Sequence, residues 1–217
     1  LLAAFAVHAG DLPAFVKKVQ LHNVGGAEAT ADGKGVKLYR VPKSVRDQLT
    51  EANKASKKTG ADTMRAAQHC EIRFVVNNMK ELGKVKVHLH TEKPGATATI
   101  YWGDILSGTQ RISFGKRTRP VNITGHGLMF NLMDKYPRGR FANDVVRVIV
   151  RGGEVTFNGI DGDVRPPKPA ELAPVMMSYG TSISQGYNAS RPDLQWNSLT
   201  ARMVGHDIVN LGSSGTA

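Results

Sequence analysis

The sequence is short of cysteine, of aromatic residues and of long apolar runs. Cys70 is its single cysteine, which excludes an internal disulfide and a cysteine-rich metal site. No run of 18 or more apolar residues occurs, so no membrane-spanning helix is predicted. Aromatic residues make up 6% of the 217 residues, and the basic clusters lack the aromatic side chains on which nucleic-acid bases stack.

Acidic residues are also outnumbered, and 29 Lys and Arg against 18 Asp and Glu give a formal charge of +11. Beyond residue 170 the only such basic residues are Arg191 and Arg202, so the excess lies in the first 170 residues. A field of this kind favours a polyanionic partner such as phosphates, an acidic polysaccharide or RNA. A solvated surface that confers solubility is the favoured interpretation. The clusters are Lys54/Lys57/Lys58, Lys80/Lys84/Lys86, Lys116/Arg117/Arg119 and Lys135/Arg138/Arg140.

The first residues, Leu1–Ala9, are short and apolar and end in Val-His-Ala. This pattern is similar to the tail of a secretory signal, which predicts a secreted or periplasmic protein. An ordinary first strand or helix packed on the domain is the favoured interpretation.

The clearest punctuation is the stretch Arg165–Ala170, which has three prolines in four residues. Proline continues neither a helix nor a central strand, so this stretch predicts a domain boundary. We expect one domain over residues 1–165 and a second unit over residues 166–217.

Short alternating segments between turn residues fill the first part of the chain. The strictest is Lys84–His90, whose period of two predicts a half-buried strand. Gly152-Gly153 predicts a tight hairpin, and a polar helix is expected from about Ser44 to Lys58. Seven short strands predict an antiparallel β-sandwich or jelly-roll-like domain. The other six are Val36–Val41, Glu71–Val76, Ala96–Trp102, Arg111–Phe114, Val145–Arg151 and Glu154–Phe157.

After the prolines the pattern changes to strand, helix, strand. An apolar run covers Pro174–Gly180, and a second covers Asp207–Gly212. Between them, residues 193–204 have helical spacing of apolar residues, namely Leu194, Trp196, Leu199 and Met203. This order predicts buried parallel strands at the opening of an α/β fold. Trp102 and Trp196 are expected in the core or in a crevice wall.

Ser182 follows the first of these strands, within Ser178–Gly186. A serine just past the carboxyl end of a parallel strand lies where ligands bind in open α/β sheets. The second strand ends in another turn rich in glycine and serine, Asn210–Gly215, so both turns are expected at one crevice. Gly212 would present its N–H beside Ser182, as part of an oxyanion hole.

These turns resemble the first two sequence blocks of the SGNH/GDSL hydrolase superfamily. The resemblance implies a flavodoxin-like hydrolase domain in which Ser182 is the nucleophile and Gly212 donates to the oxyanion. It is strongest to the subgroup with a leading β-sandwich domain, and Thr181 replaces the aspartate of the usual block. The residues that carry it are Tyr179–Gly186, Ala189–Pro192, Trp196 and Asn210–Gly215, with looser matches at Leu21–Val24, Arg40–Pro42 and Glu71–Phe74.

The family's later blocks have no counterpart in this sequence. No Gly-x-Asn-Asp block and no Asp-x-x-His pair occurs, so none of the seven histidines is assigned as the base. A serine without its base is a poor nucleophile, and we expect little activity from these residues alone. A fragment of a longer enzyme is the favoured interpretation.

The sequence therefore predicts a serine esterase or acyltransferase acting on an acyl ester of a carbohydrate or small alcohol. The alternative is a non-catalytic binding or scaffold subunit whose basic domain holds an acidic partner. No cofactor is implied. His88 and His90 share a strand face, but neighbouring lysines oppose a metal there, and Asp161-Gly162-Asp163 lacks the other ligands of a calcium loop.

Overall fold

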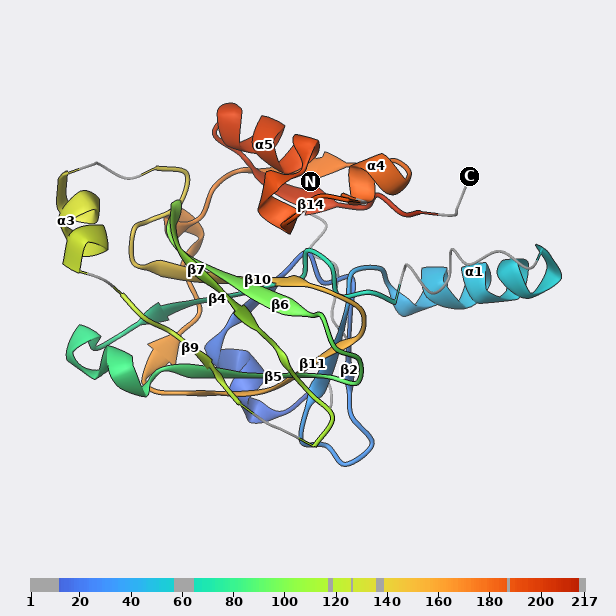
Figure 1. Cartoon of the computed structure of the whole chain (residues 1–217), viewed down its shortest axis with the longest axis horizontal. Coiled ribbons are helices and arrows are strands. Elements are labelled where there is room, and N and C mark those ends of the chain that lie inside the picture. The colour runs from blue at the N-terminus through green and yellow to red at the C-terminus, as the bar shows by residue number, and fades with distance from the viewer. Residues whose placement is uncertain are drawn as a thin grey trace.

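The computed structural model describes residues 12–56, 65–116, 119–125, 127–135, 139–186 and 188–214. Within these ranges the chain is mostly β-sheet, with several sheets and few helices (Figure 1). The leader-like segment Leu1–Ala9 lies outside the described residues, as do Lys57, Lys58, Arg117 and Arg138 of the basic clusters. None of the described helices is long and apolar enough to cross a membrane.

One six-stranded sheet, which we call the interface sheet, has the order β1-β4-β10-β6-β7, with β12 also on β4. Its neighbouring strands are all antiparallel. The predicted strands Glu71–Val76 and Val145–Arg151 are confirmed with the same bounds, as β4 and β10. The other strands are β1 (Gln20–His22), β6 (Thr97–Trp102), β7 (Ile105–Arg111) and β12 (Val164–Arg165).

The second six-stranded sheet, which we call the outer sheet, has the order β2-β3-β11-β5-β8, with β9 also on β5. On β5 (Lys86–Thr91) the expected alternation is confirmed, because Val87 and Leu89 are buried while Lys86, His88 and His90 are partly exposed. The other strands are β2 (Gly26–Ala29), β3 (Val36–Tyr39), β8 (Ser113–Phe114), β9 (Val121–Asn122) and β11 (Val155–Asp161).

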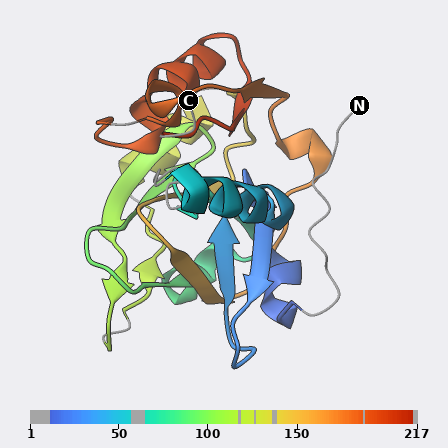
Figure 2. The same ribbon diagram turned by 90° about the vertical axis from the view of Figure 1, so that its right-hand side faces the viewer.

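Helices are few and lie outside the sheets. The expected polar helix is α1 (Lys43–Ser56), which Figure 2 shows at the ends of β2 and β3. Arg46 fastens it there, by an ion pair with Glu28 and by stacking 3.7 Å from the ring centre of Tyr39. The remaining helices of this part are α3 (Gly127–Lys135) and three short 3-10 helices at Ala14–Lys18, Met79–Lys84 and Pro169–Glu171.

The two large sheets share one hydrophobic core. Phe74 and Ile100 of the interface sheet face Leu38 and Phe157 of the outer sheet, and each of these side chains is at most 1% exposed. Trp102, also fully buried, donates from its indole N–H to the carbonyl of Thr124 over 3.1 Å, so its expected core position is confirmed. Each such side chain contributes about 1.5 to 3 kcal/mol by leaving water.

The hairpin predicted at Gly152-Gly153 is wrong. β10 before it pairs within the interface sheet, whereas β11 after it pairs within the outer sheet. The glycines carry the chain across the core, and Gly152 has φ 143° with Ala96 so close that a Cβ would lie 2.7 Å away. The predicted strand Arg111–Phe114 is likewise divided, since β7 ends at Arg111 and β8 begins at Ser113. Turn residues mark a reversal of the chain but not the partner of the next strand.

The interface sheet is buried on both faces at its central strands β4 and β10, unlike a half-buried sheet of alternating pattern. Its second face carries Glu71, Arg73 and Arg147, which are at most 4% exposed. The C-terminal residues, with α5 and β14, cover this face (Figure 1). A charged side chain in a period-two strand predicts solvent exposure, and here a later part of the same chain takes the place of solvent.

The C-terminal residues form the expected strand, helix, strand unit. β13 (Val175–Ser178) and β14 (Asp207–Asn210) pair in parallel, and between them lie α4 (Ser182–Gln185), a 3-10 helix (Pro192–Leu194) and α5 (Trp196–Met203). We call residues 173–214 the C-terminal unit.

The expectation that both parallel strands of the C-terminal unit are buried is wrong for β13. On β13, Val175 is 45% and Met177 is 61% exposed. The apolar stripe of the helical segment is also exposed, at Leu194 (42%), Trp196 (52%), Leu199 (40%) and Met203 (86%). Trp196 is therefore no core residue. The buried residues of α5 are Asn197, Ser198 and Ala201, because hydrogen bonds rather than apolar contacts turn this helix toward β13.

Candidate active site

The turns after β13 and β14 lie at one edge of their sheet. Parallel pairing aligns Val175 with Asp207 and Ser178 with Asn210. Beyond the strands the contact continues, since Leu211 N–H donates to the carbonyl of Ser178 over 2.8 Å and Ser213 N–H to that of Gly180 over 2.9 Å. The two glycine- and serine-rich turns that the sequence singled out are therefore neighbours in space.

Ser182 is the first residue of α4, directly after the turn that leaves β13. Its side chain is partly exposed, whereas that of Ser184 in the same helix is buried. The first N–H groups of a helix have no acceptor within it, so the backbone amide of Ser182 points out of the helix start. The turn itself requires glycine at 180, where φ is 158° and a Cβ would lie 2.3 Å from Ser184 Oγ.

Gly212 is buried against the other turn. A Cβ on Gly212 would lie 2.5 Å from both Gln185 N and the carbonyl carbon of Ser184, so only glycine fits here. Its N–H donates to Asn210 Oδ1 over 2.8 Å. Gly212 is thus packed beside the helix that begins at Ser182, as the sequence pattern predicts, but its amide already has an acceptor that the pattern did not reveal.

Two asparagines join the turns, and sequence reasoning missed both. Asn210 is fully buried, and its Nδ2 donates to the carbonyl of Ser184 over 2.8 Å. Asn197 of α5 donates to the same carbonyl over 2.9 Å and to Ser178 Oγ over 2.9 Å. The amide of an asparagine offers donors and an acceptor, which suits a buried junction of several backbone segments. Asn197 is buried between exposed Trp196 and Leu199, which no pattern in the sequence indicates.

The described histidines all make contacts away from Ser182. Burial and the nearby Arg40 lower the pKa of His69 to about 3, and burial with the nearby Arg73 lowers the pKa of His22. In both residues burial therefore favours the neutral ring. The contacts are His22 with Ile208 O, His69 with Gln195, His88 with Asp161, His90 with Glu92 and His206 with Val204 O.

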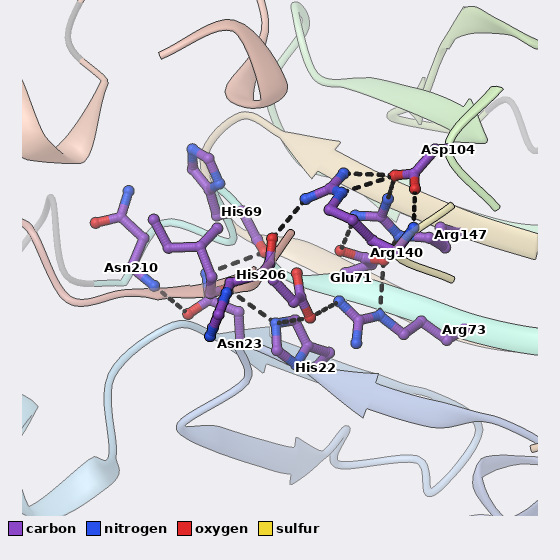
Figure 3. Close-up of polar contacts among 12 residues, drawn as sticks. His22, Asn23, His69, Glu71, Arg73, Asp104, Arg140, Arg147, His206 and Asn210 are labelled. Carbon is purple, nitrogen blue, oxygen red and sulfur yellow. Dashed lines mark hydrogen bonds and ion pairs between the residues drawn. The ribbon is translucent and has the colours of Figure 1, made fainter. Parts of the chain in front are cut away.

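A buried charge network fastens the C-terminal unit to the interface sheet (Figure 3). Arg73 pairs with Asp207 of β14 over 2.6 Å and with Glu71 over 2.7 Å, and Arg147 pairs with Glu71 over 2.6 Å. Burial opposes the ionisation of Glu71, but Arg147 and Arg73 hold the pKa of this carboxyl well below its usual range. Burial likewise opposes ionisation of Asp207, whose pKa Arg73 and His22 nevertheless lower.

Arg140 extends this network at its rim. Its guanidinium donates to Asp104 over 2.7 Å and 2.9 Å and to the carbonyl of His206, just before β14, over 2.7 Å. One member of a predicted basic cluster is therefore engaged inside the molecule. Arg202 of α5 donates in turn to the carbonyl of Asp104 over 2.9 Å.

A cavity of about 30 Å³ lies within the same interface, which is room for a single water molecule. Its lining includes Glu71, Tyr101, Arg147, Asp193 and Asp207. This cavity is too small for an ester substrate and is not lined by Ser182 or Gly212, so it belongs to the packing of the C-terminal unit. Within the described ranges no three or more His, Cys, Asp or Glu side chains gather as metal ligands.

Comparison with protein families relates the C-terminal unit to known hydrolases. Residues 173–217 match the family described as GDSL-like Lipase/Acylhydrolase. Over these residues the chain is related to GDSL-type hydrolases. The match covers the turn with Ser182 and the turn with Gly212. It also covers the strands that precede them, β13 and β14, and the helix α5 that lies between the two turns. A comparison with the curated proteins found no significant match.

Several solved structures share the fold over most of this chain. The salicylyl-acyltransferase SsfX3 from a tetracycline biosynthetic pathway matches with a TM-score of 0.65 at 12% identity, over 92% of this chain and 53% of its own. A family two carbohydrate esterase from Cellvibrio japonicus matches with a TM-score of 0.52 at 10% identity, over 93% of this chain and 50% of its own. A putative GDSL-like lipase from Bacteroides ovatus matches with a TM-score of 0.52 at 14% identity, over 92% of this chain and 55% of its own. The chain thus spans about half the length of these structures.

Proposed function

We propose that this chain carries the nucleophile of a serine-dependent esterase or acyltransferase, with Ser182 as that nucleophile. The observation that carries the proposal is the junction of the two turns, with Ser182 at a helix start and Gly212 packed against that helix. The family match over the same residues supports it, as do the acyltransferase and the carbohydrate esterase among the similar structures.

In the proposed reaction, Ser182 Oγ forms a bond to the ester carbonyl carbon and gives its proton to a base. The carbonyl oxygen becomes an oxyanion, which accepts hydrogen bonds from the amides of Ser182 and Gly212. Collapse breaks the bond to the alcohol, which leaves with the proton, and water or a second alcohol then takes the acyl group from Ser182. The Gly212 amide must be shared with, or released by, Asn210 Oδ1 for this purpose.

The base comes from outside the described residues in this proposal. The described histidines are engaged elsewhere, and a serine without a base retains only a small part of its reactivity. The resemblance to SGNH hydrolases implies an Asp-x-x-His pair for this task, a pattern that the 217 residues do not contain.

For the fold we propose a jelly-roll-like β-sandwich over residues 1–165 and the first strand, helix, strand unit of a flavodoxin-like domain over residues 166–217. The shared core of the two large sheets supports the first, and the parallel pairing of β13 and β14 supports the second. The proline-rich stretch between them includes a bidentate contact between Arg165 and Glu171, which fixes the connection.

The substrate we propose is an acyl ester of a carbohydrate or small alcohol. The carbohydrate esterase and the acyltransferase among the similar structures support this class. A polyanionic partner of the basic β-rich part and a secreted or periplasmic location stay predictions. The non-catalytic scaffold stays the alternative, and it requires that Ser182 be unreactive in the full-length gene product.

Hydrolysis of an aryl acetate by the full-length gene product tests the proposal. We expect Ser182→Ala to lower kcat/KM by about 10⁴-fold or more, as loss of a serine nucleophile does. Ser190→Ala is the matched control, since this serine is exposed and lies eight residues further along, and it should retain the wild-type rate. Equal activity of the Ser182→Ala variant and the wild type would refute the assignment.

A further inference from the structure

The strand β14 has one edge that no strand occupies in the described structure. Asp207, its first residue, and Leu211, which directly follows it, donate their N–H groups to carbonyls on the side of β13. Alternate residues of a strand direct their backbone groups to opposite edges, so Ile208 and Asn210 direct theirs away from β13. Backbone groups at a covered sheet edge need other partners.

Two consecutive residues at the end of β1, its last residue and the one that follows, supply these partners through their side chains. His22 Nε2 lies 2.9 Å from the carbonyl oxygen of Ile208, and Asn210 N–H donates to Asn23 Oδ1 over 3.0 Å. We call His22 and Asn23 the edge clamp, because their side chains bond two alternate residues as a neighbouring strand would. Figure 3 shows the contact between Asn23 and Asn210 beside the charge network.

Asn23 holds this position in an unusual backbone conformation. Its φ is 53°, one of three positive values among the described residues other than glycine, and a second belongs to His69. These two residues are joined, since Asn23 Nδ2 donates to the carbonyl of His69 over 3.1 Å. Left-handed backbone away from glycine persists only where the surroundings fix it, and asparagine tolerates it best. The Asn23 amide is thus buried, oriented and fully engaged.

The residue that Asn23 holds is the one that links the two turns of the proposed site. Asn210 accepts from Gly212 N–H through Oδ1 and donates to the carbonyl of Ser184 through Nδ2, each over 2.8 Å. The Ser184 carbonyl belongs to α4, the helix that Ser182 begins. A continuous chain of hydrogen bonds therefore runs from β1 of the β-rich part to the Gly212 turn and to the helix of Ser182.

We propose that Asn23 is a positioning residue for this site, so that the β-rich part sets the place of the Gly212 amide relative to Ser182. The inference rests on the proposed function and adds to it a role for a residue far away in the sequence. Asn23 touches no reacting atom and acts through Asn210. Its loss should change the turnover of bound substrate more than the binding of substrate, because oxyanion contacts strengthen in the transition state.

The variant Asn23→Gly removes the side chain and keeps the backbone conformation, since glycine adopts positive φ without strain. Asn23→Asp keeps an oxygen acceptor for Asn210 N–H and loses the donor to His69. Asn77→Gly is the matched control, because it removes an asparagine whose exposed side chain bonds Asp163 in the β-rich part, away from both turns.

In the full-length gene product, at a temperature where all variants are folded, we expect Asn23→Gly to lower kcat for an aryl acetate about ten- to a hundredfold. KM should change less than about threefold, Asn23→Asp should regain part of the loss, and Asn77→Gly should match the wild type. Hydrogen exchange resolved to single residues should show faster exchange of the Asn210 amide in Asn23→Gly alone.

Unchanged exchange at Asn210 in Asn23→Gly would overturn the clamp itself, whatever the activity. Faster exchange with wild-type kcat would overturn the positioning role, and so would a loss confined to KM. Failure of the proposed function gives a different result from either of these. The full-length wild type would then be inactive, whereas the faster exchange of the Asn210 amide in Asn23→Gly would still be observed.

Discussion

The β-rich part and the C-terminal unit bury opposite kinds of side chain. Between the two large sheets the buried residues are apolar, as Leu38 and Phe74 are. In the C-terminal unit the buried residues include Asn197, Asp207 and Asn210, while apolar side chains such as those of β13 and α5 are exposed. The β-rich part is therefore stabilised by removing apolar surface from water. The contact of the C-terminal unit with it depends on hydrogen bonds and ion pairs.

The largest effect should come from breaking the charge network under the C-terminal unit. Glu71→Gln leaves the guanidinium groups of Arg73 and Arg147 buried with one carboxylate fewer, and we expect a loss of about 3 to 5 kcal/mol in the free energy of unfolding. Denaturant titration measures it. Glu92→Gln is the control, because this side chain is 84% exposed and its contact with His90 spans 3.8 Å, and its loss should stay near zero.

A matched pair of leucines sharpens the contrast in apolar burial. Leu38 is fully buried between the sheets, whereas Leu199 on α5 is 40% exposed. Leu38→Ala should cost about 2 to 5 kcal/mol of unfolding free energy through lost burial and the cavity left behind. Leu199→Ala should cost less than about 1 kcal/mol. Equal losses in denaturant titration would contradict the assignment of apolar stabilisation to the β-rich part alone.

The effect that is smallest over a single pH unit is a slope of stability against pH. The pKa of His69 is lowered by burial and Arg40 to about 3, so between pH 6.5 and 3 the unfolded chain binds a proton that the folded chain does not. Stability should therefore fall with falling pH in this window, by about 1.4 kcal/mol per pH unit for this group. His69→Asn, which tolerates the left-handed backbone at φ 71°, should reduce the slope, and an unchanged slope would show that His69 titrates normally.

Local patterns predicted the elements better than their partners. β4 and β10 have the predicted bounds, and the strand, helix, strand order after the prolines is confirmed, because each depends on a short run of side chains. The predicted pairing of β11 with β10 was wrong. Glycines at 152 and 153 are compatible both with a hairpin and with a crossing from one sheet to the other.

The candidate site was predicted only where its residues are close in sequence. The turns of Ser182 and Gly212 each follow an apolar strand, and parallel strands bring such turns together. Asn23 contacts Asn210 across 187 residues of sequence, and no local pattern contains such a contact. The buried charges of β4 were missed for the same reason, because the C-terminal unit that covers them comes more than 100 residues later.

The central claim is that Ser182, at the junction of the two turns, is the reactive serine. Treating the full-length gene product with a fluorophosphonate and identifying the labelled peptide by mass spectrometry tests it most directly. We predict one adduct, on Ser182, that is lost in Ser182→Ala and in heat-denatured protein. An adduct on another serine, or none in a folded preparation, would contradict the claim.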